Sequence, residues 1–164
     1  MAACTGKYKL TTSENFEEFM KALGVGLVTR KLGNKSSPTV TITEEAGEFT
    51  MKQESLVKTS EIKFRIGQEF DEVTADGRQG KFVHRHNKTQ FNKSIFCWNK
   101  MLDKLAFFLV KSKMTLKSPN VMIHEMLGTN GGKDSVCIRE FLGDKMVATC
   151  KVDDIETVRS YAAI

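Results

Sequence analysis

The chain has 164 residues, the length of one domain, and its 40% hydrophobic content is enough to build either a core or a lined cavity. It begins with no apolar leader, and no stretch approaches the roughly 18 apolar residues that a membrane span requires. The net charge of +5 would ordinarily suggest nucleic acid or acidic membranes as partners, but the excess lies within residues 80–109, which hold six Lys or Arg and one acid, Asp103. We therefore expect a single cytoplasmic domain over residues 1–164.

Reactive side chains give little sign of a metal site or of catalysis. Cys4, Cys97, Cys137 and Cys150 have no C-x-x-C spacing, which is typical of reduced thiols that pack as small hydrophobes. The pair His84 and His86 could join Cys97 around a metal, but no fourth ligand is evident. No Ser-His-Asp arrangement, glycine-rich phosphate loop or paired-carboxylate motif has a spacing that compels catalysis. We predict no metal, no cofactor and no enzymatic activity.

The first elements are a strand and two helices. In residues 6–11, Tyr8 and Leu10 alternate with lysines, which predicts a strand. A helix should follow, begun by a capping pair of Asn15 with Glu18. Its apolar stripe consists of Phe16, Phe19, Met20 and Leu23. Glycines at 24 and 26 end this helix, and a second short helix is expected over residues 27–32 before the breaker at 36–38.

From residue 40 the pattern changes to the period of two that is typical of half-buried antiparallel strands. The expected strands are 40–43, 49–51, 62–66, 70–73, 110–116, 121–126, 133–141, 146–152 and 157–161. The dipeptide Asp76-Gly77 is a strong hairpin signal after the fifth strand. Ten short strands with one helical pair after the first favour an all-β, up-and-down barrel that closes on itself around a cavity.

Several motifs resemble the cytosolic fatty-acid-binding protein family, which includes the cellular retinoid-binding proteins. They are Gly6-x-Tyr8-x-Leu10, Asn15-Phe16-Glu17-x-Phe19-Met20, Gly67-Gln68-Glu69-Phe70-Asp71-Glu72, Thr74-Ala75-Asp76-Gly77-Arg78 and Val158-Arg159-Ser160-Tyr161. The similarity covers residues 1–79 and 110–164 in the family's order. It implies a lipocalin-like (calycin) barrel of ten antiparallel strands with a helix-turn-helix lid.

Residues 80–109 match nothing in that family and form an extra 30-residue insertion at the hairpin between the fifth and sixth strands. Without them Gln79 would precede Val110, which is similar to the family's usual hairpin. Gly80-Lys81-Phe82 can be encoded by GGT AAG TTT, a splice-donor consensus, and the far edge is compatible with a pyrimidine-rich acceptor. Our hypothesis is a retained intron.

Two other interpretations of the insertion stay open. Its basic side chains alternate with aromatic ones, as in a nucleic-acid-binding module. The aromatic residues are Phe82, Phe91, Phe96 and Trp98. Its last part has an amphipathic pattern suited to a membrane surface or to covering the portal. The apolar residues there are Met101, Leu105, Phe108 and Leu109.

The resemblance implies intracellular binding and transport of long-chain fatty acids, with retinoic acid as the alternative ligand of the same family. Arg159 and Tyr161 are two apart on a strand and share a face, and the resemblance places Arg139 beside them; these three would hold the ligand carboxylate. The residues implied for the cavity and portal are Phe16, Met20, Val25, Thr29, Val57, Ala75 and Asp76. Val57 departs from the aromatic residue that many relatives carry. We expect a monomer that touches membranes transiently and does not bind nucleic acid.

Overall fold

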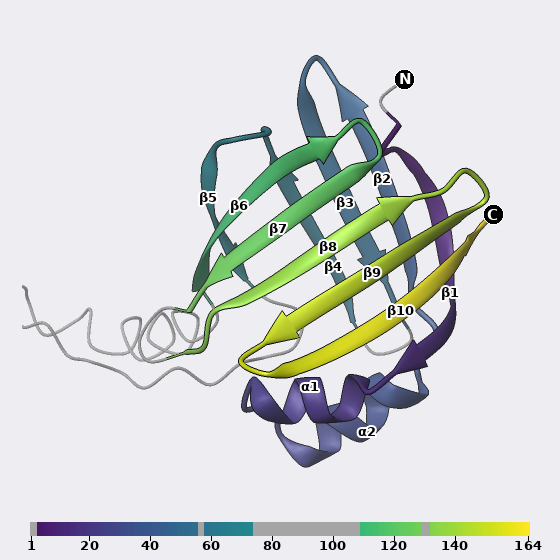
Figure 1. Cartoon of the computed structure of the whole chain (residues 1–164). Helices are drawn as coiled ribbons and strands as arrows, with labels where there is room; N and C mark the ends of the chain where they lie inside the picture. Colours follow the sequence, from purple (N-terminus) through teal and green to yellow (C-terminus); the bar gives the residue numbers. More distant parts are fainter. Residues whose placement is uncertain (1–2, 56–57, 74–108, 129–131) are drawn as a thin grey trace, which may run out of the picture.

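The computed structural model describes residues 3–55, 58–73, 109–128 and 132–164, and they form one antiparallel sheet of ten strands with two helices across one end (Figure 1). The elements are β1 (Gly6–Glu14), α1 (Phe16–Ala22), α2 (Leu27–Lys35), β2 (Thr39–Glu45), β3 (Glu48–Glu54), β4 (Thr59–Phe64), β5 (Glu69–Val73), β6 (Leu109–Ser118), β7 (Val121–Leu127), β8 (Ser135–Phe141), β9 (Lys145–Val152) and β10 (Ile155–Ala163). The predicted ten-stranded fold with its helical pair is confirmed, and α2 extends beyond the predicted residue 32.

The sheet curls into a barrel because its first and last strands pair. β1 pairs with β10, so the sheet runs β4-β3-β2-β1-β10-β9-β8-β7-β6-β5. The two end strands, β4 and β5, do not pair with each other, and the prediction of complete closure is therefore wrong at this seam. Stacked rings of Phe64 and Phe70, with centroids 5.8 Å apart, fill the seam, and the Gly67 amide donates to the carbonyl of Met114 at 2.8 Å. A pair of stacked rings and a backbone hydrogen bond from the β4–β5 connection to β6 thus hold the barrel together where the ladder stops.

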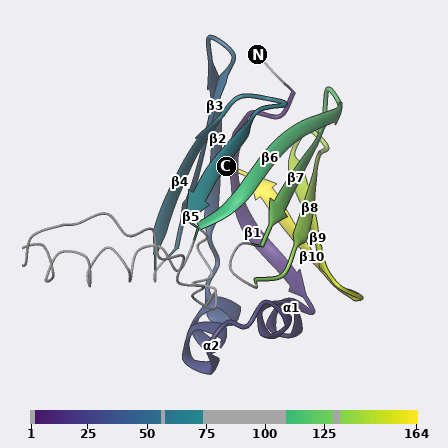
Figure 2. The same ribbon diagram turned by 90° about the vertical axis from the view of Figure 1, so that its left-hand side faces the viewer.

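The helices cap one end of the barrel (Figures 1 and 2). Asn15 begins α1 in the left-handed region, with φ 55°, a conformation that asparagine tolerates. Its side-chain amide donates to the carbonyl of Glu156 at 2.7 Å instead of capping the helix, so the predicted capping pair with Glu18 is wrong. The buried Phe19 and Met20 attach α1 to the barrel through a cluster that includes Val152. The lid is therefore fixed by β10 and by apolar packing.

The cysteines differ from expectation. Cys137 and Cys150 face each other directly across β8 and β9, and a disulfide joins them. The prediction of reduced thiols is therefore wrong for this pair, because alternation alone does not give the register that brings two strands' side chains together. Cys4 is a buried free thiol, and Cys97 lies outside the described residues.

The strands on either side of the insertion still form their ladder. Glu72 pairs with Val110 and Val73 with Leu109, so the ladder between β5 and β6 reaches Leu109, the last residue of the insertion. The predicted Asp76-Gly77 turn and residues 80–108 lie outside the described part of the chain.

Candidate functional site

A cavity of about 220 Å³ lies between the helical cap and the inner face of the barrel. Its apolar lining comes from both the cap and the sheet and includes Phe16, Met20, Met51, Ile62 and Met126. Its ionisable lining includes Glu72, His124, Arg139, Arg159 and Tyr161. A concave, mostly apolar space with a few convergent polar groups is the usual form of a small-molecule site.

Arg159 and Tyr161 lie on the inner face of β10, with exposed fractions of 7% and 4%. The Arg159 guanidinium carbon is 4.0 Å from the centroid of the Phe16 ring and 5.8 Å from that of Tyr161. Burial lowers the pKa of Arg159, although an arginine stays charged at neutral pH. Its buried Nε has no hydrogen-bond partner among the described residues. The side chain is thus a desolvated cation in contact with the lid.

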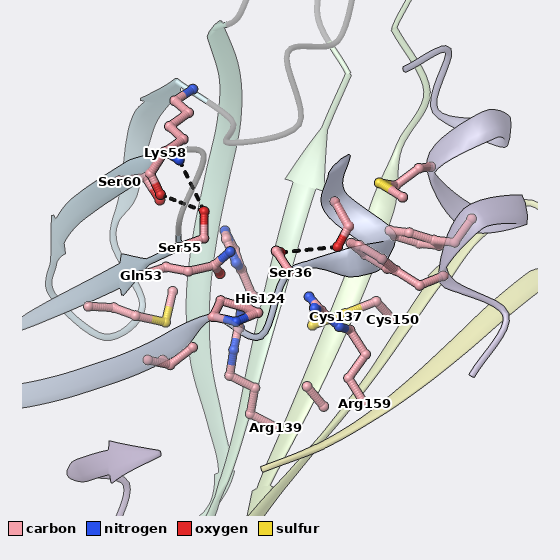
Figure 3. A pocket seen from close by; sticks show the side chains of 18 of the residues that line it. Ser36, Gln53, Ser55, Lys58, Ser60, His124, Cys137, Arg139, Cys150 and Arg159 are labelled. Carbon is pink, nitrogen blue, oxygen red and sulfur yellow. Dashed lines mark hydrogen bonds between the residues drawn. A yellow bond between two sulfur atoms is a disulfide. The ribbon is translucent and has the colours of Figure 1, made fainter. Parts of the chain in front are cut away.

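Arg139 lies in the same row of the barrel wall. It pairs with Ala148 on β9, which in turn pairs with Arg159 on β10, so two cationic side chains flank one small residue. Figure 3 shows both arginines projecting into the pocket. Arg139 is half-buried, and its Nη1 atom is fully buried without a partner among the described residues. Burial lowers the pKa of Arg139, while Tyr161 and Glu72 oppose that shift and Arg159 adds to it.

A second polar group in the cavity was missed by the sequence analysis. His124 Nε2 lies 2.9 Å from Glu72 Oε2, and the Ser112 hydroxyl donates to the same oxygen at 2.9 Å. Burial alone would raise the pKa of Glu72, but the hydrogen bond and charge of His124, the Ser112 hydrogen bond and the Arg139 charge together lower it. The alternation of inward- and outward-facing residues could have identified both side chains. Glu72 shares a strand face with Phe70, and His124 lies between two inward-facing methionines.

The predicted portal residues fall into three groups. Phe16, Met20 and Thr29 line the cavity. Val25 is buried in the apolar cluster beneath the helices and is not among the cavity-lining side chains. The remaining three, Val57, Ala75 and Asp76, lie outside the described residues.

The described ranges contain no group of three or more His, Cys, Asp or Glu residues that could hold a metal; His84, His86 and Cys97 fall outside them. None of the helices in the described part of the chain is both long and apolar enough to cross a membrane.

The fold and the cavity define a class: small calycin barrels that enclose a ligand beneath a helical lid. Residues 5–140 match the model of the lipocalin / cytosolic fatty-acid binding protein family, and the chain belongs to that family. The resemblance found in the sequence is confirmed.

Individual relatives support the same assignment. The muscle fatty acid-binding protein of Schistocerca gregaria is 34% identical over 158 residues, which cover 96% of this chain and 93% of that protein. Fatty acid-binding protein 9 of Homo sapiens is 33% identical over 159 residues, or 97% and 96% of the two chains. Among solved structures, a Schistosoma mansoni fatty acid binding protein in complex with arachidonic acid has a TM-score of 0.77 and 30% identity, covering 100% of this chain and 98% of its own.

Proposed function

We propose that the protein binds long-chain fatty acids reversibly in this cavity and carries them through the cytoplasm, with Arg139, Arg159 and Tyr161 holding the carboxylate. The observation that carries the proposal is the pair of arginines whose buried nitrogens have no partner among the described residues. Burying a cation without a counter-charge is unfavourable. A ligand carboxylate would supply both the charge and the acceptor oxygens, in a geometry that suits the guanidinium fork.

The rest of the cavity suits the acyl tail. At ~0.8 kcal/mol per buried CH₂, a long chain contributes on the order of 10 kcal/mol before the costs of association and ordering. The methionines Met20, Met51 and Met126 supply adaptable apolar contacts along its path. Tight but reversible binding of a hydrophobic acid follows, and the proposal includes no catalytic step.

We also propose that the carrier is a monomer and touches membranes transiently while it exchanges ligand. The outer face of α2 exposes Leu27 by 53%, Val28 by 73% and Leu32 by 46%. A double variant L27S/V28S should then transfer fatty acid to vesicles more slowly at unchanged affinity. Equal transfer rates would contradict membrane contact through α2.

The experiment that tests the carrier function is a titration of delipidated protein with hexadecanoate and, in competition, retinoic acid. Submicromolar binding of hexadecanoate that weakens in Arg159→Gln and Arg139→Gln is the expected result. Arg65→Gln is the matched control, because Arg65 is 48% exposed and pairs with Glu48 outside the cavity. Tighter binding of retinoic acid would assign the retinoid alternative, and no binding of either acid would overturn the proposal.

A further inference from the structure

The Cys137–Cys150 disulfide lies in the wall of the ligand cavity, and Figure 3 shows both cysteines there. Cys137 is 2% exposed and Cys150 is half-buried. The residues that flank Cys150 on β9, Thr149 and Lys151, are not among the cavity-lining residues, because successive strand residues face opposite sides of a sheet. A reagent that reacts with the sulfur atoms must therefore enter the space that the ligand would occupy.

The disulfide also lies between the barrel and its lid. Cys150 packs against the apolar cluster of the barrel, which includes Ala148, and against the lid cluster, which includes Phe19 and Met20. Among the described residues, no other side chain belongs to both clusters. Two residues along the same strand pair, Arg139 pairs with Ala148, so the disulfide is next to the proposed carboxylate site on one side and next to the lid on the other.

A disulfide is unusual in the compartment in which the proposed carrier would work. Glutathione keeps thiols reduced in the cytosol, and a disulfide that forms there is usually transient and either catalytic or redox-sensing. Cys4 differs from the pair: it is a buried free thiol that donates to the carbonyl of Pro119 at 3.1 Å and does not line the cavity. The sulfur atoms of Cys137 and Cys150 instead face a space that admits small molecules, which fits a redox-sensing role.

We propose that the Cys137–Cys150 pair is a redox modification site inside the ligand cavity, which low-molecular-weight thiols such as glutathione reduce when no ligand is bound. The inference rests on the proposed function, because the fatty acid would cover the same sulfur atoms. A glutathione thiolate attacks Sγ of Cys150, the less buried residue, and the S–S bond breaks with Cys137 leaving as a thiolate. A second glutathione thiolate attacks the glutathione sulfur of the mixed disulfide and releases Cys150. Two glutathione molecules are oxidised to their disulfide, and their protons pass to the two cysteines.

Reduction should weaken ligand binding. Two thiols need van der Waals separation, whereas bonded sulfur atoms lie closer together, so at least one sulfur moves when the bond breaks. The β8–β9 ladder keeps Cys137 opposite Cys150, and the sulfur therefore moves either into the cavity or against the lid cluster. Added bulk in a packed interior is unfavourable, and we expect about tenfold weaker binding of hexadecanoate. By linkage, saturating ligand should lower the reduction potential of the disulfide by about 30 mV, the two-electron equivalent of that tenfold difference.

The test compares the oxidised and reduced forms of the delipidated full-length chain. Hexadecanoate is titrated into each form, and the reduction potential is measured in glutathione buffers with and without saturating hexadecanoate, with the thiols counted by alkylation and mass spectrometry. The expected results are about tenfold weaker binding by the reduced form and a potential about 30 mV lower with ligand. Saturating hexadecanoate should also slow the reduction at least about tenfold, because the thiol reacts only with the small fraction of empty cavities.

Two double serine variants are the matched controls. C137S/C150S lacks the pair and retains Cys4 and Cys97, so its affinity should be the same under oxidising and reducing conditions. C4S/C97S retains only the pair and should keep the whole difference, and it remains informative if C137S/C150S fails to fold. The inference is wrong if the pair stays reduced in oxidised glutathione, if both redox forms bind equally, if ligand does not slow the reduction, or if reduction unfolds the chain. If neither redox form binds hexadecanoate, the carrier function fails instead.

Discussion

Arg159→Gln should weaken ligand binding without lowering the stability of the ligand-free protein. A hydrogen bond to a charged partner contributes about 1.5–3 kcal/mol, so its loss should weaken hexadecanoate binding by about 10- to 150-fold. In the ligand-free protein, the same substitution removes a 7%-exposed cation whose burial lowers its pKa. The relief of that desolvation, several kcal/mol, exceeds the contact with Phe16, which is worth about 1–2 kcal/mol. The unfolding free energy should therefore stay constant or rise.

Two measurements on delipidated protein check this reasoning: hexadecanoate titration and urea denaturation at pH 7. Arg65→Gln serves again as control, because it removes the same charge from a half-exposed side chain that is 3.8 Å from Glu48. It should leave affinity unchanged and alter stability by less than about 1 kcal/mol. The reasoning is refuted if Arg159→Gln lowers the unfolding free energy by more than that while affinity is retained, because Arg159 would then be a structural cation.

Three further predictions concern stability. Because the pKa of Glu72 is lowered in the folded state, its carboxylate stabilises the protein above the ordinary pKa of 4.5, and this stabilisation is lost as the pH falls through the folded-state pKa. Denaturation curves between pH 7 and pH 3 should therefore show a smaller decline in stability for Glu72→Gln than for the wild type. Reducing the Cys137–Cys150 disulfide, whose cysteines are 13 residues apart, should lower the unfolding free energy by roughly 3 kcal/mol, measured by denaturation with and without dithiothreitol. Deleting residues 80–109 should keep the β5–β6 ladder and hexadecanoate binding and raise stability by roughly 1.5–2 kcal/mol through a shorter loop. A deletion variant that does not fold would contradict this, and transcript reads that join the codons of Gln79 and Val110 would support the intron hypothesis.

Local patterns in the sequence carried most of the fold. Alternation identified the strands, and the stripe that includes Phe19 and Met20 identified α1. Spacing alone put Arg159 and Tyr161 on one face, and both side chains are buried.

Features that depend on register between strands were harder to predict. Whether Arg139 lies in the row of Arg159 depends on two successive pairings through Ala148, and the Cys137–Cys150 contact depends on the β8–β9 register. The contacts of Glu72 on β5 require the correct alignment of β6 and β7, because its partners Ser112 and His124 lie on those two strands. A single-chain pattern contains the alternation of each strand but not the alignment between them.

The arginines buried in the cavity wall affect how the lid and the proposed ligand site are connected. Nine successive strand pairings join the ten strands of the described sheet, and apolar clusters pack part of the barrel's interior and attach α1. Stability therefore comes from the ladder and from those clusters, which leaves the cavity wall free to hold side chains that are unfavourable without a ligand. The Phe16 ring, whose centroid is 4.0 Å from the Arg159 guanidinium carbon, partly compensates one of them and connects the lid to the proposed head-group site. A carboxylate bound to Arg159, as proposed, would compete with this contact, so the free energy of ligand binding and the packing of α1 would be coupled through a single pair of side chains.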